Sequence, residues 1–138
     1  FYRNSYEVID SRLQPLYTGK TIDTISQAVL DIAYYTKNDQ YKLGPKSILV
    51  NRNSCTYADY LFVHSDRLGK YEDDAVLHSA SIIDVYNITN NTYVFSFYLY
   101  HQPKKKLTEF RVYKNMLVAI VEDHLWLYRL KPTFFKML

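Results

Sequence analysis

One carboxylate stands where burial would give it chemistry. Asp84 lies in an apolar run predicted to be a strand, between Ile82 and Tyr86 on the same face. An aspartate surrounded by apolar side chains has a raised pKa and can act as a general base. The simpler interpretation, which we favour, is that this strand face is open to solvent and that Asp84 is hydrated.

A second group of residues combines basic and aromatic side chains. It consists of two tyrosines followed by three lysines: Tyr98, Tyr100, Lys104, Lys105 and Lys106. Such a group can hold single-stranded nucleic acid through phosphate contacts and base stacking. Residues 103–138 carry a net charge of +5, but the whole chain carries only +3, which is modest for a nucleic-acid binder. We therefore expect these residues to contact a protein partner, and nucleic acid is the less favoured alternative.

Other familiar motifs are incomplete. Residues 18–21 end like a phosphate-binding loop, but Gln14 stands where that loop needs a glycine. Residues 64–66 read His-Ser-Asp, yet neighbours in a predicted helix cannot face one another as a catalytic triad. The four histidines lack the paired spacing of a zinc site, and Cys55 has no second cysteine to pair with. We therefore expect no catalytic residues, no metal and no cofactor.

The elements that would position these side chains divide the chain into two halves. In the first half, apolar residues at helical spacing predict helices over residues 5–13, 21–37 and 54–68. Thr21 and Ser54 are the expected N-caps of the second and third helices. A short strand is expected at residues 48–50, and residues 70–74 form an acidic linker.

The second half alternates between apolar and polar residues. Five antiparallel strands are expected, over residues 75–89, 92–101, 107–113, 116–122 and 125–130. Their turns are expected at residues 90–91, 114–115 and 123–124, and a basic loop at residues 102–106. Phe95 and Phe97 fall on one face, which we expect to be buried against the second helix.

These elements predict a single α+β domain, in which N-terminal helices pack on a four- to five-stranded antiparallel sheet. A chain of 138 residues with 48% apolar residues is long enough for one core and too short for two domains. The helical part covers about residues 5–69, the meander about 75–130 and a C-terminal tail 131–138.

The expected order of elements, helices first and an antiparallel meander afterwards, resembles that of the nuclear-transport-factor-like superfamily. A cystatin-like layout would also suit the second half. The resemblance implies a curved sheet that wraps the helices into a cone. Assembly factors of type IV secretion and conjugation machines look similar in size, and they are exported domains cut from a membrane anchor. A chain that begins with Phe1 fits such a fragment. Enzymes with this cone place polar residues in its cavity, which here would bring Asp59, Tyr57, Asp84 and Tyr98 to one mouth.

The tail carries Phe134 and Phe135, and two outcomes are open. If exposed, these side chains form an apolar patch that binds a partner; if folded back, they plug the open end of the sheet. Our functional hypothesis is a non-catalytic protein-interaction domain of a multi-protein assembly, with a secretion or conjugation apparatus as one candidate. The alternatives are a small-molecule-binding or hydrolytic cone enzyme, and a viral or phage protein that binds a host factor.

The location of the protein is left open by the sequence. An exported protein whose membrane anchor lies outside this stretch is one hypothesis, because no apolar run approaches 18 residues. Asn87 and Asn90 begin two adjacent glycosylation sequons, which matter only in a secreted eukaryotic protein.

Overall fold

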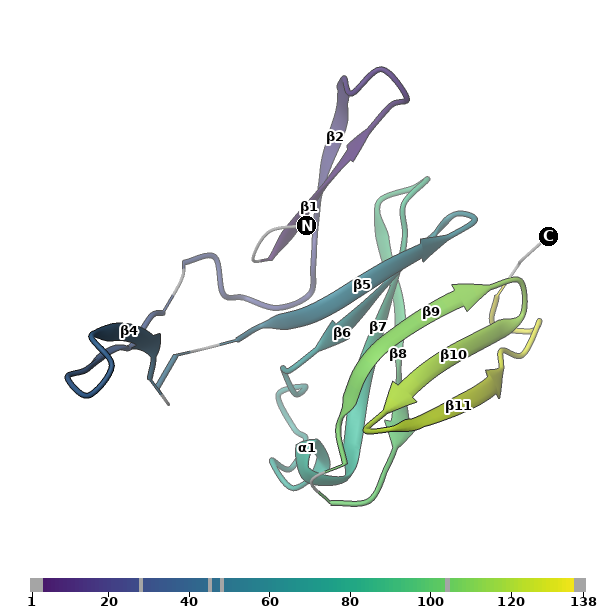
Figure 1. The fold of residues 1–138 in the computed structure, drawn as a ribbon. Helices are drawn as coiled ribbons and strands as arrows, with labels where there is room; N and C mark the ends of the chain where they lie inside the picture. The colour runs from purple at the N-terminus through teal and green to yellow at the C-terminus, as the bar shows by residue number, and fades with distance from the viewer. Residues whose placement is uncertain (1–3, 28, 45, 48, 104, 136–138) are drawn as a thin grey trace.

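The computed structural model describes residues 4–135 except 28, 45, 48 and 104, and in this part the chain is almost entirely β (Figure 1). The elements in chain order are β1 (Ser5–Ile9), β2 (Pro15–Lys20), β3 (Ile32–Tyr35), β4 (Gln40–Leu43), β5 (Asn51–Tyr57), β6 (Tyr60–Ser65), α1 (Val76–Ser79), β7 (Ala80–Asn87), β8 (Thr92–Tyr100), β9 (Leu107–Tyr113), β10 (Met116–Val121) and β11 (His124–Arg129). With 3% helix and 53% strand, the structure contradicts the predicted α+β class. The order of helices and strands that carries the resemblance to the nuclear-transport-factor-like superfamily is therefore not found.

The helix expected over residues 54–68 is a hairpin of β5 and β6. Ala58 and Asp59 form its turn, and Ala58 has a positive φ of 49°. All six residues of β6 are buried, because both faces of this strand are covered. A strand covered on both faces loses its alternation, so its apolar positions match a helical spacing equally well.

The other two expected helices are also wrong. Residues 5–13 form β1 and the start of a turn, in which the Asp10 carboxylate accepts hydrogen bonds from the backbone N–H groups of Arg12 and Gln14, both at 2.8 Å. Thr21, the expected N-cap, instead donates its hydroxyl to Asp23 at 2.5 Å. Of the apolar residues that a helix would have turned to the core, Ile22, Val29 and Ile32 are 46–62% exposed.

Four of the five strands expected in the second half lie close to the expected places. The first, expected over residues 75–89, begins only at Ala80, because α1 (Val76–Ser79) occupies its start. The five strands also belong to two sheets and not to one. A four-stranded sheet has the order β5-β6-β7-β8, and a three-stranded sheet has the order β11-β10-β9, both antiparallel. The chain crosses from one sheet to the other between β8 and β9. Where the sheets meet, β5 lies beside β9, and the Asn53 amide donates to the backbone oxygen of Thr108 at 3.1 Å.

The main core lies between the inner faces of these two sheets. Phe62 and Ile83 come from the four-stranded sheet, and Phe110 and Leu117 from the three-stranded sheet; all are at most 1% exposed. Phe135 closes this core and stacks on Phe62 at 5.8 Å between ring centroids. The C-terminal tail therefore plugs the gap between the sheets.

Phe95 and Phe97 also point to this core. They are half-buried, and their rings lie 5.2 and 6.4 Å from that of Phe135. Their partner is thus the C-terminal tail and not the expected helix.

The hairpin of β1 and β2 covers the outer face of the four-stranded sheet. Tyr6 packs against Leu61, Val63 and Tyr86, and its hydroxyl donates to the Asn91 side chain at 3.0 Å. A side chain at Gly19, on the paired strand, would collide with the Tyr6 ring, so the close packing of this hairpin needs a glycine there. The chain beyond β2 is thereby held along this outer face.

Candidate functional site

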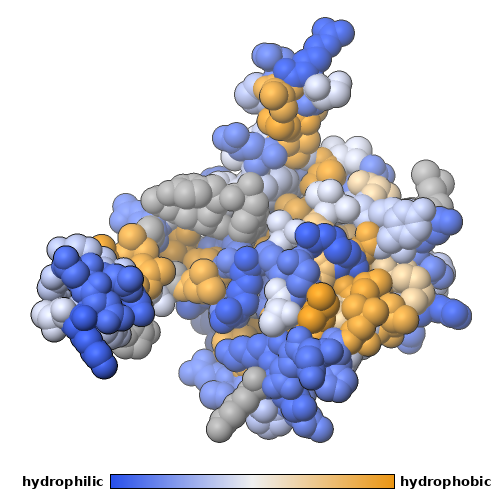
Figure 2. Space-filling view, in the orientation of Figure 1, coloured by the Kyte–Doolittle hydropathy of each residue, from blue (hydrophilic) through white to orange (hydrophobic). Residues whose placement is uncertain are grey.

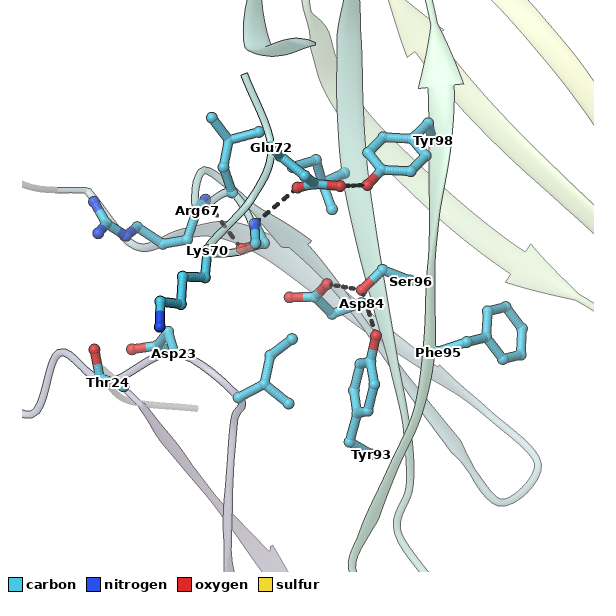
Figure 3. A pocket seen from close by; sticks show the side chains of 15 residues that line it. Asp23, Thr24, Arg67, Lys70, Glu72, Asp84, Tyr93, Phe95, Ser96 and Tyr98 are labelled. Carbon is cyan, nitrogen blue, oxygen red and sulfur yellow. Dashed lines mark hydrogen bonds between the residues drawn. The ribbon is translucent and has the colours of Figure 1, made fainter. Parts of the chain in front are cut away.

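A cleft of about 740 Å³ opens on the outer face of the four-stranded sheet (Figure 3). Its floor is formed by β7 and β8, and its walls by residues 65–72 and 22–24. The second wall is fixed because the backbone N–H of Ile22 donates to the hydroxyl of Tyr86 at 3.1 Å.

Asp84 lies at the floor of this cleft and is only 5% exposed, so the solvent-open interpretation of this residue is wrong. Ser96, its partner across the β7–β8 pair, donates to the Asp84 carboxylate at 2.5 Å, and Ser65 makes a second side-chain hydrogen bond to it. Burial raises the pKa of Asp84, and the two serine hydroxyls oppose that rise.

A tyrosine extends this hydrogen-bond chain. The hydroxyl of Tyr93 lies 2.9 Å from the hydroxyl oxygen of Ser96. Because Ser96 gives its only proton to Asp84, Tyr93 must be the donor in this contact. Tyr93, Ser96 and Asp84 thus form a relay of donors that ends at the buried carboxylate.

Glu72 fixes the wall of the cleft opposite Asp84. Its carboxylate accepts hydrogen bonds from the Tyr98 hydroxyl and, at 2.7 Å, from the backbone N–H of Gly69. Arg67 and Lys70 come from the same loop, and Figure 3 shows Lys70 reaching across the mouth toward Asp23. The cleft therefore presents three carboxylates and two cationic side chains.

Only some of the residues that the sequence analysis placed in a pocket line the same cleft in the structure. Asp84 and Tyr98 both line the cleft, whereas Asp59 sits exposed in the β5–β6 turn. Tyr57 packs edge-on against Tyr113 at 5.7 Å and belongs to the edge of the main core.

The sequence interpretation missed Ser65, Glu72, Tyr93 and Ser96. A signal existed for Ser96, since alternation along the strand places it on the same face as Tyr98. Glu72 could not be found in this way, because its contact with Tyr98 spans 26 residues and depends on the path of a loop.

The residues expected to bind a partner are scattered. Tyr100 is 68% exposed on β8, Lys105 pairs with Glu122 at 3.3 Å, and Lys106 is exposed. Lys104 lies outside the described residues. Phe134 is 60% exposed and touches Phe95 at 5.9 Å, whereas Phe135 is buried.

A different surface is more apolar than any of these: the hairpin of β3 and β4, which projects from the body of the molecule (Figure 1). Its cross-strand pairs Ile32–Leu43 and Tyr34–Tyr41 share one face, on which they are 50–75% exposed. The Tyr34 and Tyr41 rings pack on each other at 5.0 Å. We call these four residues the arm face.

The base of this arm is closed by polar contacts. The Asp31 backbone N–H donates to the Ser47 hydroxyl at 2.9 Å, and the Gly44 N–H donates to the Asp31 carbonyl oxygen. The arm is thus tied at its base, and its apolar face is left uncovered.

The described residues contain no group of histidine, cysteine, aspartate and glutamate side chains that could hold a metal ion. No helix within them is long and apolar enough to span a membrane. Comparisons of the chain with family models, curated proteins and solved structures find no match.

Proposed function

We propose that this domain is a non-catalytic interaction domain that assembles with further copies of itself, and that the arm face makes the contact. The observation that carries the proposal is the exposed arm face on a projecting hairpin. An isolated two-stranded hairpin is at best marginally stable in water, and it gains stability when its apolar face packs on another surface. An assembled partner would supply that surface.

The same chain offers a surface to receive the arm. On the outer face of the three-stranded sheet, Ile120 pairs with Leu125 and Val118 with Leu127 across β10 and β11. Leu125 and Leu127 are 65% and 61% exposed, and an apolar patch is visible over these strands (Figure 2). We call these four residues the receiving face.

The two faces are different surfaces of one chain, so a contact between them is head-to-tail. In such a contact each copy uses its arm face on one neighbour and its receiving face on the other, and chains of copies form unless a ring closes. A contact that used the same face on both copies would stop at a dimer.

Sedimentation velocity across a concentration range tests this. We expect the wild-type chain to associate with rising concentration, and Tyr41→Ser to abolish association because it removes the most exposed ring of the arm face, at 75%. Gln40→Ser is the matched control, since Gln40 is the adjacent residue on the opposite face of the same hairpin and is also exposed.

A mixing experiment separates the head-to-tail contact from other modes. Leu127→Lys should abolish association through the receiving face, and an equimolar mixture of Tyr41→Ser with Leu127→Lys should form dimers, since one intact interface remains between them. A wild-type chain that stays monomeric throughout would refute self-assembly. Association without rescue in the mixture would refute the head-to-tail arrangement.

A further inference from the structure

The cleft beside Asp84 is separate from both the arm face and the receiving face, and its side chains have no part in the assembly proposed above. Its volume of about 740 Å³ falls within the range of about 300–1,000 Å³ that is typical of small-molecule sites. It therefore has room for a ligand larger than a single ring.

The charges at the cleft point to a neutral ligand. Asp23, Glu72 and Asp84 face Arg67 and Lys70 across it, so neither an anion nor a cation meets a surface of only the opposite sign. Burial raises the pKa of Asp84, and its hydrogen bonds from Ser96 and Ser65 oppose that rise. Such a site favours groups that both donate and accept hydrogen bonds, and hydroxyl groups do both.

Two aromatic rings complete the site. Tyr93 and Tyr98 lie on either side of the Ser96–Asp84 pair, and both come from β8 (Figure 3). Their hydroxyls are engaged by Ser96 and Glu72, so each ring is held at its tip. A ring that is held in place contacts an apolar ligand face at little cost in conformational entropy.

We propose that this cleft binds a short, uncharged carbohydrate. The C–H face of a sugar ring would pack on Tyr98 or Tyr93. The sugar hydroxyls would donate to the carboxylates of Asp84 and Glu72 and accept from Arg67 and Lys70. The serine contacts of Asp84 fix its carboxylate before the ligand arrives, which lowers the cost of binding.

The test is an NMR titration of the isotopically labelled full chain with four probes: cellotriose, maltotriose, mannotriose and tri-N-acetylchitotriose. We expect at least one of them to shift backbone amide signals of residues 65–72 and 82–98, with the largest changes near Asp84 and Tyr98. Tyr98→Ala should weaken that binding at least tenfold.

Tyr100→Ala is the matched control, because Tyr100 also lies on β8, is exposed and does not line the cleft. It should change the dissociation constant by less than about twofold, which is under 0.5 kcal/mol. Asp84→Asn, which keeps the size of the side chain, should weaken binding even if Tyr98→Ala proves unstable.

Three results would overturn the proposal: no shift with any of the four probes, equal weakening by Tyr98→Ala and Tyr100→Ala, or shifts at the same amides from tetramethylammonium or phosphate alone. The titration is repeated on the Tyr41→Ser variant. This separates the two proposals, since the cleft should bind equally well whether or not the chain assembles.

Discussion

Phe135 and Phe134 are adjacent in the chain, yet only Phe135 reaches the core, so replacing each by alanine isolates the role of the tail. Phe135 is 6% exposed, and its ring lies within 5.2–6.4 Å of four others, those of Phe62, Tyr60, Phe95 and Phe97. Removing a buried phenylalanine ring costs about 3–5 kcal/mol of unfolding free energy. We expect about 3 kcal/mol for Phe135→Ala, since the half-buried rings of Phe95 and Phe97 beside it can relax toward the space.

That loss is large compared with the stability of a typical domain, about 5–15 kcal/mol. For a chain of this length it corresponds to a fall in Tm of roughly 10 °C. Phe134, at 60% exposure, keeps less than half of its surface in contact, and Phe134→Ala should cost less than about 1 kcal/mol.

Urea unfolding followed by tryptophan fluorescence measures both variants. Trp126 is the only tryptophan in the sequence, and it packs against the core that Phe135 closes. The midpoint should fall strongly for Phe135→Ala with little change in the slope, which reports the surface exposed on unfolding. Equal midpoints for the two variants would refute the conclusion that the tail is a structural plug.

Two further predictions concern buried titratable groups. Burial lowers the pKa of His64 from 6.5 to about 4, and the charged or titratable groups around it are Asp66, Arg52, His101 and Lys106. The unfolded state then binds more protons than the folded state between pH 6.5 and 4. Stability should therefore fall as the pH drops through that window, by on the order of 3 kcal/mol. Urea unfolding of the wild type at pH 7 and pH 4 should show this loss, and the same loss in a His64→Leu chain would contradict the prediction. Burial also raises the pKa of the Cys55 thiol from 9.0 to about 11, which lowers the fraction of reactive thiolate at pH 8. Iodoacetamide at pH 8 should therefore alkylate the folded chain about 100-fold more slowly than the unfolded chain in urea. Mass spectrometry over time measures both rates, and similar rates would contradict the prediction.

The last three strands, β9 to β11, could be predicted because each keeps one face exposed to solvent, whereas β7 is buried on both faces. Alternation along β8 and short turns such as that at Lys114 and Asn115 mark the hairpins directly. The division of those strands between two sheets could not be predicted. Alternation of apolar and polar residues indicates where a strand lies in the sequence, but not which other strand it pairs with. The connection between β8 and β9 leads from one sheet to the other, and nothing in its composition distinguishes it from a hairpin loop.

The first half failed for a different reason. The apolar residues near Ile22, Val29 and Ile32 match a helical stripe, but they are 46–62% exposed, so the pattern does not report a buried face. In β6 the opposite holds, because both faces are buried and the pattern loses its period. For the cleft, Asp84 was recognisable from its apolar neighbours. Its burial depended on a hairpin and a loop whose positions the sequence does not reveal.

The place of Phe135 in the chain also bears on how the protein folds as it is synthesised. Each hairpin of the body joins neighbouring segments and can pair as soon as it leaves the ribosome, since domains fold as they emerge from the N-terminal end. The ring that closes the core comes after all eleven of the described strands. Until residue 135 has emerged, the rings that it covers, those of Phe62, Phe95 and Phe97, stay accessible in the nascent chain.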